Sequence, residues 1–129
     1  MREILFRAKR FRTDNWVVGY YDGYGVLPSM SINPDDVFCN IDYETLGQFT
    51  GRYDKDGVRI FEGDIVRLSL PIAKDLVYTA IGKIIYDESC SFSCETLSKK
   101  VGTFPLAPDF KYEVIGNIYD NPELLEANE

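Results

Sequence analysis

The sequence contains no histidine and only three cysteines, and both scarcities restrict its chemistry. Without histidine, the chain lacks the commonest general base and the Ser–His and Cys–His nucleophile pairs. Cys39, Cys90 and Cys94 form an odd set, which does not indicate a disulfide framework. Three thiols also leave one position of a tetrahedral zinc site unfilled. We therefore interpret all three cysteines as small buried apolar residues.

Long apolar runs are missing as well. No stretch approaches the roughly 18–20 apolar residues that span a bilayer. The N-terminal MREILFRAKRF does not have the pattern of a signal peptide. We therefore expect a cytoplasmic protein that does not contact a membrane.

Positive charge is scarce over most of the chain. The net charge is −7, but the first twelve residues carry +4, so the remainder carries −11. An acidic body disfavours nonspecific binding to phosphate backbones. The basic N-terminal end could meet an acidic surface, including that of a second copy, although such charge runs usually face solvent. The candidate interaction surface consists of Arg2, Arg7, Arg10, Arg12 and Trp16.

The composition favours β-structure. Aromatic residues make up 14% of the 129 residues, with nine Tyr and eight Phe. Flat and β-branched side chains pack well on a pleated sheet. A chain of this length suffices for one domain with its own core.

The sequence of the N-terminal third predicts a β-hairpin followed by loops. Residues 3–11 and 16–21 are expected to pair around a turn at 13–15, with Gly19 as a candidate bulge and Trp16 as a core anchor. Residues 22–34 read as loop with a short strand at 29–32, and strand character returns at 37–41. Single helical turns are expected at 33–36, 42–46 and 121–125.

The stretch from Glu44 to Leu68 concentrates turn signals. The sequence predicts strands at 47–51, 59–61 and 65–70, separated by tight reversals at 54–57 and 62–64. Asp54-Lys55-Asp56-Gly57 resembles part of a calcium loop. In that register, however, Arg52 and Gly63 occupy ligand positions that they cannot fill, so we interpret the motif as a turn. The glycines assigned to structural turns are Gly47, Gly51, Gly57, Gly63 and Gly116.

The second half predicts further strands at 77–87, 89–96 and 111–119, with Gly82 as a bulge. Residues 71–76 are an ambiguous connector, and 99–109 read as loop. Together these short strand–turn units predict a mainly β fold, β-rich α+β at most, in the form of a small, partly open barrel. We expect one domain over residues 1–125, with a hairpin and loop layer at about 1–50, the barrel at about 51–125, and a frayed tail at 126–129.

Four segments, in order and nearly end to end, resemble the YopX family of phage and prophage proteins from Gram-positive bacteria. They are residues 2–7, 16–20, 44–66 and 112–125, with GQFTG, DKxG and EGDIV as the most specific parts. The family usually has an apolar residue in place of Arg52 and often a proline near Tyr43. The resemblance implies a β-rich fold, SH3-like in its second half, encoded by a phage or prophage and located in the host cytoplasm. It implies no catalytic residues.

We therefore expect a non-enzymatic protein-interaction or self-assembling β-module, without metal or cofactor. Its partner would be a second copy, a host protein or a phage protein. The alternative is a small barrel associated with nucleic acid, in which Phe6, Phe11 and Trp16 would join the basic residues. A variant of that alternative is an acidic decoy of a DNA-binding protein.

An enzyme would have to use carboxylates. The candidates for acid–base chemistry or metal binding are Glu44, Asp54, Asp56, Glu62, Asp64 and Asp87. Four of them fall in the predicted reversals, where short acidic side chains commonly bond to their own backbone. We therefore predict turn roles for them, and expect no enzymatic activity.

Overall fold

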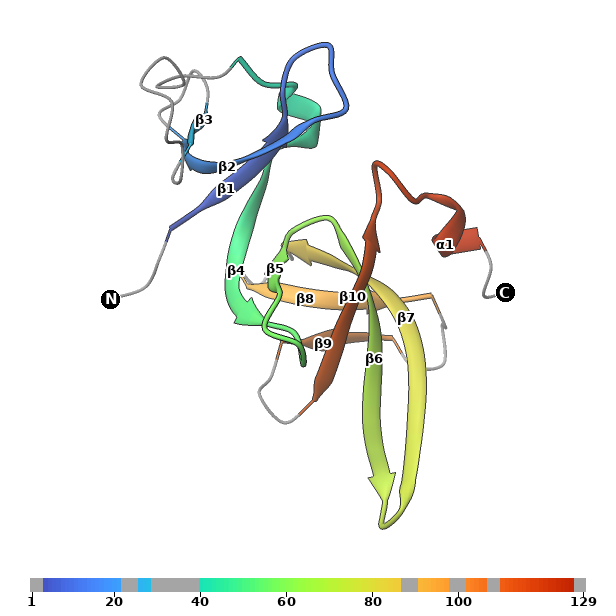
Figure 1. Cartoon of the computed structure of the whole chain (residues 1–129). Helices are drawn as coiled ribbons and strands as arrows, with labels where there is room; N and C mark the ends of the chain where they lie inside the picture. Colours follow the sequence, from blue (N-terminus) through green and yellow to red (C-terminus); the bar gives the residue numbers. More distant parts are fainter. Residues whose placement is uncertain are drawn as a thin grey trace. The chain divides into compact units, whose positions relative to one another are not determined.

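The computed structural model describes residues 4–21, 26–28, 40–86, 91–97, 102–106 and 110–126. Their strands form two antiparallel sheets, accompanied in these ranges by one short α-helix and one 3-10 turn (Figure 1). The predicted mainly β fold is confirmed, and within the described ranges the sheets do not close into a barrel. Contacts divide the chain into two compact units, Met1–Gly51 and Arg52–Glu129.

The first unit contains the predicted N-terminal hairpin. Strands β1 (Phe6–Lys9) and β2 (Trp16–Tyr21) pair antiparallel, with Phe6 opposite Gly19 and Lys9 opposite Trp16. This register runs without a shift, so the prediction of a bulge at Gly19 is wrong. Strands β3 (Val26–Pro28) and β4 (Gly47–Tyr53) flank the hairpin. With β5 (Arg59–Phe61) at its edge, the sheet has the order β3-β2-β1-β4-β5.

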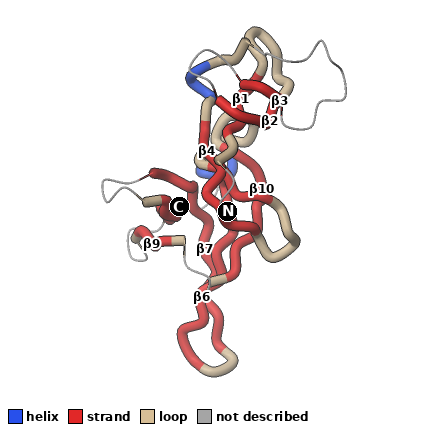
Figure 2. The backbone as a smooth tube through the Cα atoms, turned by 90° about the vertical axis from the view of Figure 1, so that its left-hand side faces the viewer, coloured by secondary structure: helices blue, strands red, loops and turns tan. Residues whose placement is uncertain are grey.

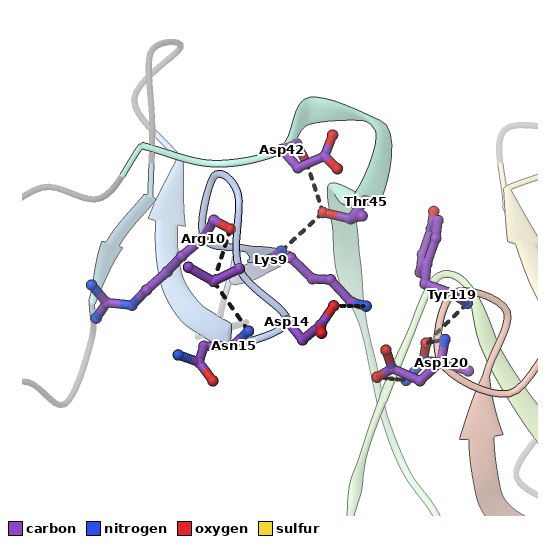
Figure 3. A network of polar contacts seen from close by, with 10 residues as sticks. Lys9, Arg10, Asp14, Asn15, Asp42, Thr45, Tyr119 and Asp120 are labelled. Atoms are coloured by element: carbon purple, nitrogen blue, oxygen red, sulfur yellow. Dashed lines mark hydrogen bonds and ion pairs between the residues drawn. The ribbon is translucent and has the colours of Figure 1, made fainter.

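A small apolar cluster and two hydrogen bonds of the Thr45 hydroxyl stabilise this unit. Ala8, Val17 and Ile41 are buried together, with Leu46 packed against them. The 3-10 turn η1 (Tyr43–Thr45), where a helical turn was predicted, delivers the Thr45 hydroxyl to the hairpin. This hydroxyl donates to Asp42 O at 2.7 Å and accepts from Lys9 N at 2.9 Å (Figure 3). The turn is thereby tied to the end of β1.

The second unit is built on a sheet of order β10-β6-β7-β8-β9. Its elements are β5 (Arg59–Phe61), β6 (Asp64–Ala73), β7 (Leu76–Tyr86), β8 (Phe92–Thr96), β9 (Thr103–Pro105), β10 (Lys111–Asn117) and α1 (Glu123–Glu126). Strand β5 belongs to the first sheet by its pairing. Figure 2 shows β6 and β7 as one long hairpin.

The core of this unit lies on one face of the second sheet. Its buried members are Ile60, Val66, Leu68, Leu70, Ile84, Cys94, Leu106 and Tyr112. Cys94 is fully buried there, as predicted, and burial raises the pKa of its thiol to about 12, with a further contribution from the charge of Glu95. Cys39 and Cys90 lie outside the described residues.

Three details of the second half differ from the sequence predictions. The connector at 71–76 is the end of a long hairpin, because β6 continues to Ala73 and β7 begins at Leu76. Gly82 is not a bulge. It lies opposite Val66 in regular register, and a Cβ there would stand 2.7 Å from Cys94 Sγ and from Glu95 O, so the glycine permits a close approach of β8. The predicted loop at 99–109 contains the short strand β9, which pairs with β8.

Candidate interaction surface

The N-terminal hairpin brings Arg7 and Trp16 together, as the candidate surface requires. Arg7 Cζ lies 4.9 Å from the centroid of the Trp16 ring, and Lys9 Nζ lies 5.6 Å from it. Both cations are therefore within cation–π distance of the indole. Trp16 is half-buried and alternates along β2 with the buried Val17, so its ring lies on the face opposite the apolar cluster. The expected role of Trp16 as a core anchor is wrong.

A second basic residue of that surface, Arg12, lies beside a different ring. Arg12 lies in the hairpin turn with a φ of +62°, and its Cζ is 5.1 Å from the ring centroid of Phe11, which is 52% exposed. Arg10 forms a backbone bridge with Ile41. Arg2 lies outside the described residues. Among the described residues, Arg7 and Arg12 thus lie beside two different aromatic rings.

Asp54 organises the first predicted reversal. Its Oδ1 accepts from Asp56 N at 2.8 Å and Val58 N at 2.9 Å, which closes the turn locally. Its Oδ2 accepts from Val114 N at 3.0 Å, on β10. Burial raises the pKa of this carboxyl, but these three backbone N–H donors and the charge of Lys55 outweigh burial and hold the pKa below its usual value. Asp54 is therefore a structural acid that joins the turn to β10.

The carboxylates considered for catalysis are distributed among structural positions. Asp64 is 1% exposed, and its Oδ2 accepts from Phe61 N at 2.8 Å in the second reversal. Glu44 lies in η1, whereas Asp56 is exposed in the first reversal and pairs with Lys55. Asp87 lies outside the described residues. Among the residues described, no three His, Cys, Asp or Glu side chains are grouped so that they could hold a metal ion.

The assigned glycines divide into two kinds. Gly51, Gly57 and Gly63 have φ values of +85°, +81° and +91°. Gly47 and Gly116 lack a positive φ and lie within β4 and β10, and Gly51 lies within β4 as well. At Gly116 the register with β6 shifts, and an added Cβ would meet Asn121 Oδ1 at 2.6 Å, so the small residue there accommodates a side chain.

The β6–β7 hairpin carries a surface that the sequence analysis missed. The ladder of β6 with β10 ends at Ser69, and the ladder of β7 with β8 begins at Gly82. Residues 70–80, which we call the arm, therefore continue past both neighbours as a two-stranded ribbon. Figure 1 shows the β6–β7 hairpin projecting beyond the other strands of its sheet.

The end of the arm is apolar and exposed. Leu76, Val77 and Tyr78 are 54%, 57% and 41% exposed. Pro71 and Ala73 on the facing strand are exposed as well. Only Lys74 and Asp75 are charged in the arm, so its net charge is zero in a chain of −7. The apolar run at 76–78 was visible in the sequence, but it could not be distinguished from a buried strand.

No helix in the described part of the chain is long and apolar enough to cross a membrane. What the geometry defines is a small antiparallel β-protein with a projecting hairpin.

The comparisons with known proteins place this fold in a family. The chain belongs to the YopX family, because the family model described as YopX protein matches residues 6–126. Among curated proteins, no sequence matches the chain. One similar solved structure is the crystal structure of protein EF1440 from Enterococcus faecalis, with a TM-score of 0.55 and 24% identity. That alignment covers 97% of this chain and 99% of EF1440, and it shows a shared fold.

Proposed function

We propose that this protein is a non-enzymatic β-module that self-associates through the arm. The family resemblance suggests that it is phage- or prophage-encoded and acts in the host cytoplasm, and that its second sheet is SH3-like. The observation that carries the proposal is the arm itself, an exposed apolar ribbon that extends past the strands on both sides.

Pairing with a further strand would increase the stability of a two-stranded ribbon such as the arm. An isolated hairpin is marginally stable in water, and exposed strand edges are templates for pairing with another chain. Proteins often protect such edges with proline or charge. In the arm, Pro71 interrupts the donors of β6, whereas residues 76–80 of β7 contain no proline and no charge. The β7 edge is therefore the one suited to pairing.

A second copy of the chain suits this edge best. Two copies of −7 repel each other, but the arm itself is neutral and adds nothing to that repulsion where the two copies would pair. Antiparallel pairing of β7 with β7 places the same edge on both sides of a two-fold axis, as an isologous dimer requires. Burial of exposed side chains such as Leu76 and Val77 would contribute about 1–2 kcal/mol each.

Analytical ultracentrifugation over a range of concentrations tests the proposal. The wild type should sediment as a dimer or larger assembly, and Val77→Lys should shift it to the monomer because it places a lysine from each copy in the paired edge. Val58→Lys is the matched control, since Val58 is 49% exposed but lies outside the arm. A monomeric wild type, or equal dissociation by both variants, would contradict the proposal.

Nucleic-acid binding is a second candidate, favoured by Arg12 lying over the exposed Phe11 ring at the hairpin turn. An exposed aromatic ring with a cation beside it can stack on a base while the charge meets a phosphate. A mobility shift with single-stranded DNA at low salt, abolished by Phe11→Ala with Arg12→Gln, would support it. Absence of any shift at low salt would rule it out.

A further inference from the structure

The outer face of β6 and β10 carries a cationic pocket of about 230 Å³. The residues that line it are Lys55, Arg67, Ser69, Lys111, Tyr112 and Glu113. Leu68 and Tyr112 are opposite each other and belong to the core. Their chain neighbours therefore point to the other face of the sheet, away from the core. The pocket lies outside the arm and is independent of the self-association proposed above.

The pocket residues come from three segments, β6, β10 and the turn at Lys55, which backbone hydrogen bonds hold together. Arg67 is directly opposite Glu113, and Ser69 is directly opposite Lys111, in the β6–β10 ladder. On the other side of β10, Lys55 N donates to Tyr112 O at 2.9 Å. Directly opposite residues have Cβ atoms about 4.5–5.5 Å apart. The polar groups of the pocket are thus held in a defined register.

One carboxylate is shared by two of the three cations. Glu113 Oε1 is 2.5 Å from Arg67 Nη1, and its Oε2 is 3.5 Å from Lys55 Nζ. Lys55 also pairs with Asp56 at 3.4 Å, and the hydrogen bond and charge of Asp56, followed by the charge of Glu113, raise the pKa of Lys55. In the described part of the chain, no carboxylate lies within ion-pair distance of Lys111. The lining has a charge of +2, or +1 when Asp56 is counted, within a chain of −7.

We propose that this pocket binds a phosphoryl group, either free phosphate or the phosphomonoester of a small molecule. Its volume is below the roughly 300–1,000 Å³ of sites for drug-sized ligands, and so suits one small anionic group. The available donors are the Lys111 ammonium, the Ser69 hydroxyl and the Arg67 nitrogens that do not bond Glu113. A phosphate offers several acceptor oxygens and about two negative charges to such separate donors.

A carboxylate ligand suits the pocket less well. Carboxylates are bound most strongly by the planar fork of one guanidinium through two parallel hydrogen bonds. Here one nitrogen of the Arg67 guanidinium already bonds Glu113. The remaining donors come from two other side chains on two strands, an arrangement that favours a tetrahedral group.

The test is an NMR titration of the full chain with inorganic phosphate at constant ionic strength. The amide signals of Ser69 and Lys111 should shift and give a dissociation constant, which Lys111→Gln should raise about tenfold. Lys83→Gln is the matched control, because Lys83 pairs with Glu95 at 3.8 Å on the same sheet and outside the pocket. The same spectra verify that both variants are folded. No shift at these amides, or equal weakening by both variants, would overturn the proposal.

Parallel titrations identify the source of the group. Tighter binding of glycerol phosphate than of inorganic phosphate would assign a phosphomonoester, and equal or weaker binding would assign free phosphate. Tighter binding of acetate or of a dinucleotide phosphodiester at the same amides would overturn the assignment to a phosphoryl group.

Discussion

Asp54 and Val114 are 60 residues apart in the sequence, yet Asp54 Oδ2 accepts a 3.0 Å hydrogen bond from Val114 N. The same carboxylate closes its own turn through Asp56 N and Val58 N. A single side chain thus joins a local reversal to the last strand of the second sheet. This relationship makes Asp54 a structural residue whose contribution can be measured in two ways.

The first measurement is the stability of Asp54→Asn. An asparagine oxygen can still accept from the turn, but its amide group would face Val114 N, a donor against a donor. We expect a loss of about 1.5–3 kcal/mol in the free energy of unfolding, measured by urea denaturation. Asp56→Asn, in the same turn but exposed, is the control and should cost less than about 0.5 kcal/mol. Equal effects of the two changes would contradict a special role for Asp54.

The second measurement is the pH dependence of that loss. The pKa of Asp54 in the folded protein lies below its usual value of 3.8, so its ionised form is favoured by folding. The resulting stability is fully present above the unfolded pKa and is lost as the pH falls through the folded pKa. The stability difference between wild type and Asp54→Asn should therefore be constant near neutral pH and shrink below about pH 4. A difference that grows on acidification would show that the pKa is shifted in the opposite direction.

Alanine substitutions at Gly57 and Gly63 would distinguish the cost of backbone strain from the cost of steric crowding. Both have positive φ, but a Cβ at Gly57 meets nothing within 4 Å, whereas one at Gly63 would stand 3.3 Å from Tyr119 Cε2. Gly63 also donates to Ile84 O and accepts from Ile118 N, both at 2.9 Å. We expect Gly57→Ala to cost about 1–2 kcal/mol from strain alone. Gly63→Ala should cost about 1 kcal/mol more.

Thermal or urea unfolding of the two variants is the measurement. Gly102→Ala is a useful third variant, because Gly102 has a φ of +80° and open space around it. It should resemble Gly57→Ala. A Gly63 variant that is no less stable than the other two would show that Tyr119 moves aside without cost.

These results show what local sequence determines here. The turn at Asp54 and Gly57 is predictable from the sequence, because the hydrogen bonds that close it lie within five consecutive residues. The turn role of Gly63 was predictable in the same way, but its close approach to Tyr119 and that of Gly82 to Cys94 involve distant segments, so no local pattern reveals those contacts. The connector at 71–76 was ambiguous for a different reason, because its turn lacks the usual sequence signal. Lys74 and Asp75 form a two-residue reversal without glycine, with Asp75 at a φ of +64°, which aspartate tolerates better than most residues.

The candidate interaction surfaces were only partly predictable. The sequence correctly grouped Arg7 with Trp16, because the two residues are diagonal neighbours across a short hairpin: Lys9 is opposite Trp16, and Arg7 lies two residues before Lys9 on the same face. It did not identify the arm, because exposure at Leu76 and Val77 depends on where β8 and β10 end. It also did not identify the cationic pocket, whose charged residues come from segments near 55, 67 and 111.

Cys94 provides a test of burial in the second core. Its thiol is fully buried, and burial raises its pKa to about 12, so the reactive thiolate is scarce near neutral pH. In a Cys39→Ser, Cys90→Ser variant, we expect iodoacetamide to leave the native protein unlabelled at pH 8 and to label it fully in urea. Rapid labelling of the folded variant, monitored by mass spectrometry, would place Cys94 outside a closed core.

The central functional claim is that the β7 edge of the arm pairs with a second copy, and amide hydrogen exchange tests it most directly. Within residues 76–80, the N–H groups that point away from β6 are exposed in the single chain and bonded in the proposed dimer. Their protection should rise with protein concentration and should be lost in Val77→Lys, while amides of the second core stay unchanged. Fast exchange of these amides at every concentration would contradict the account.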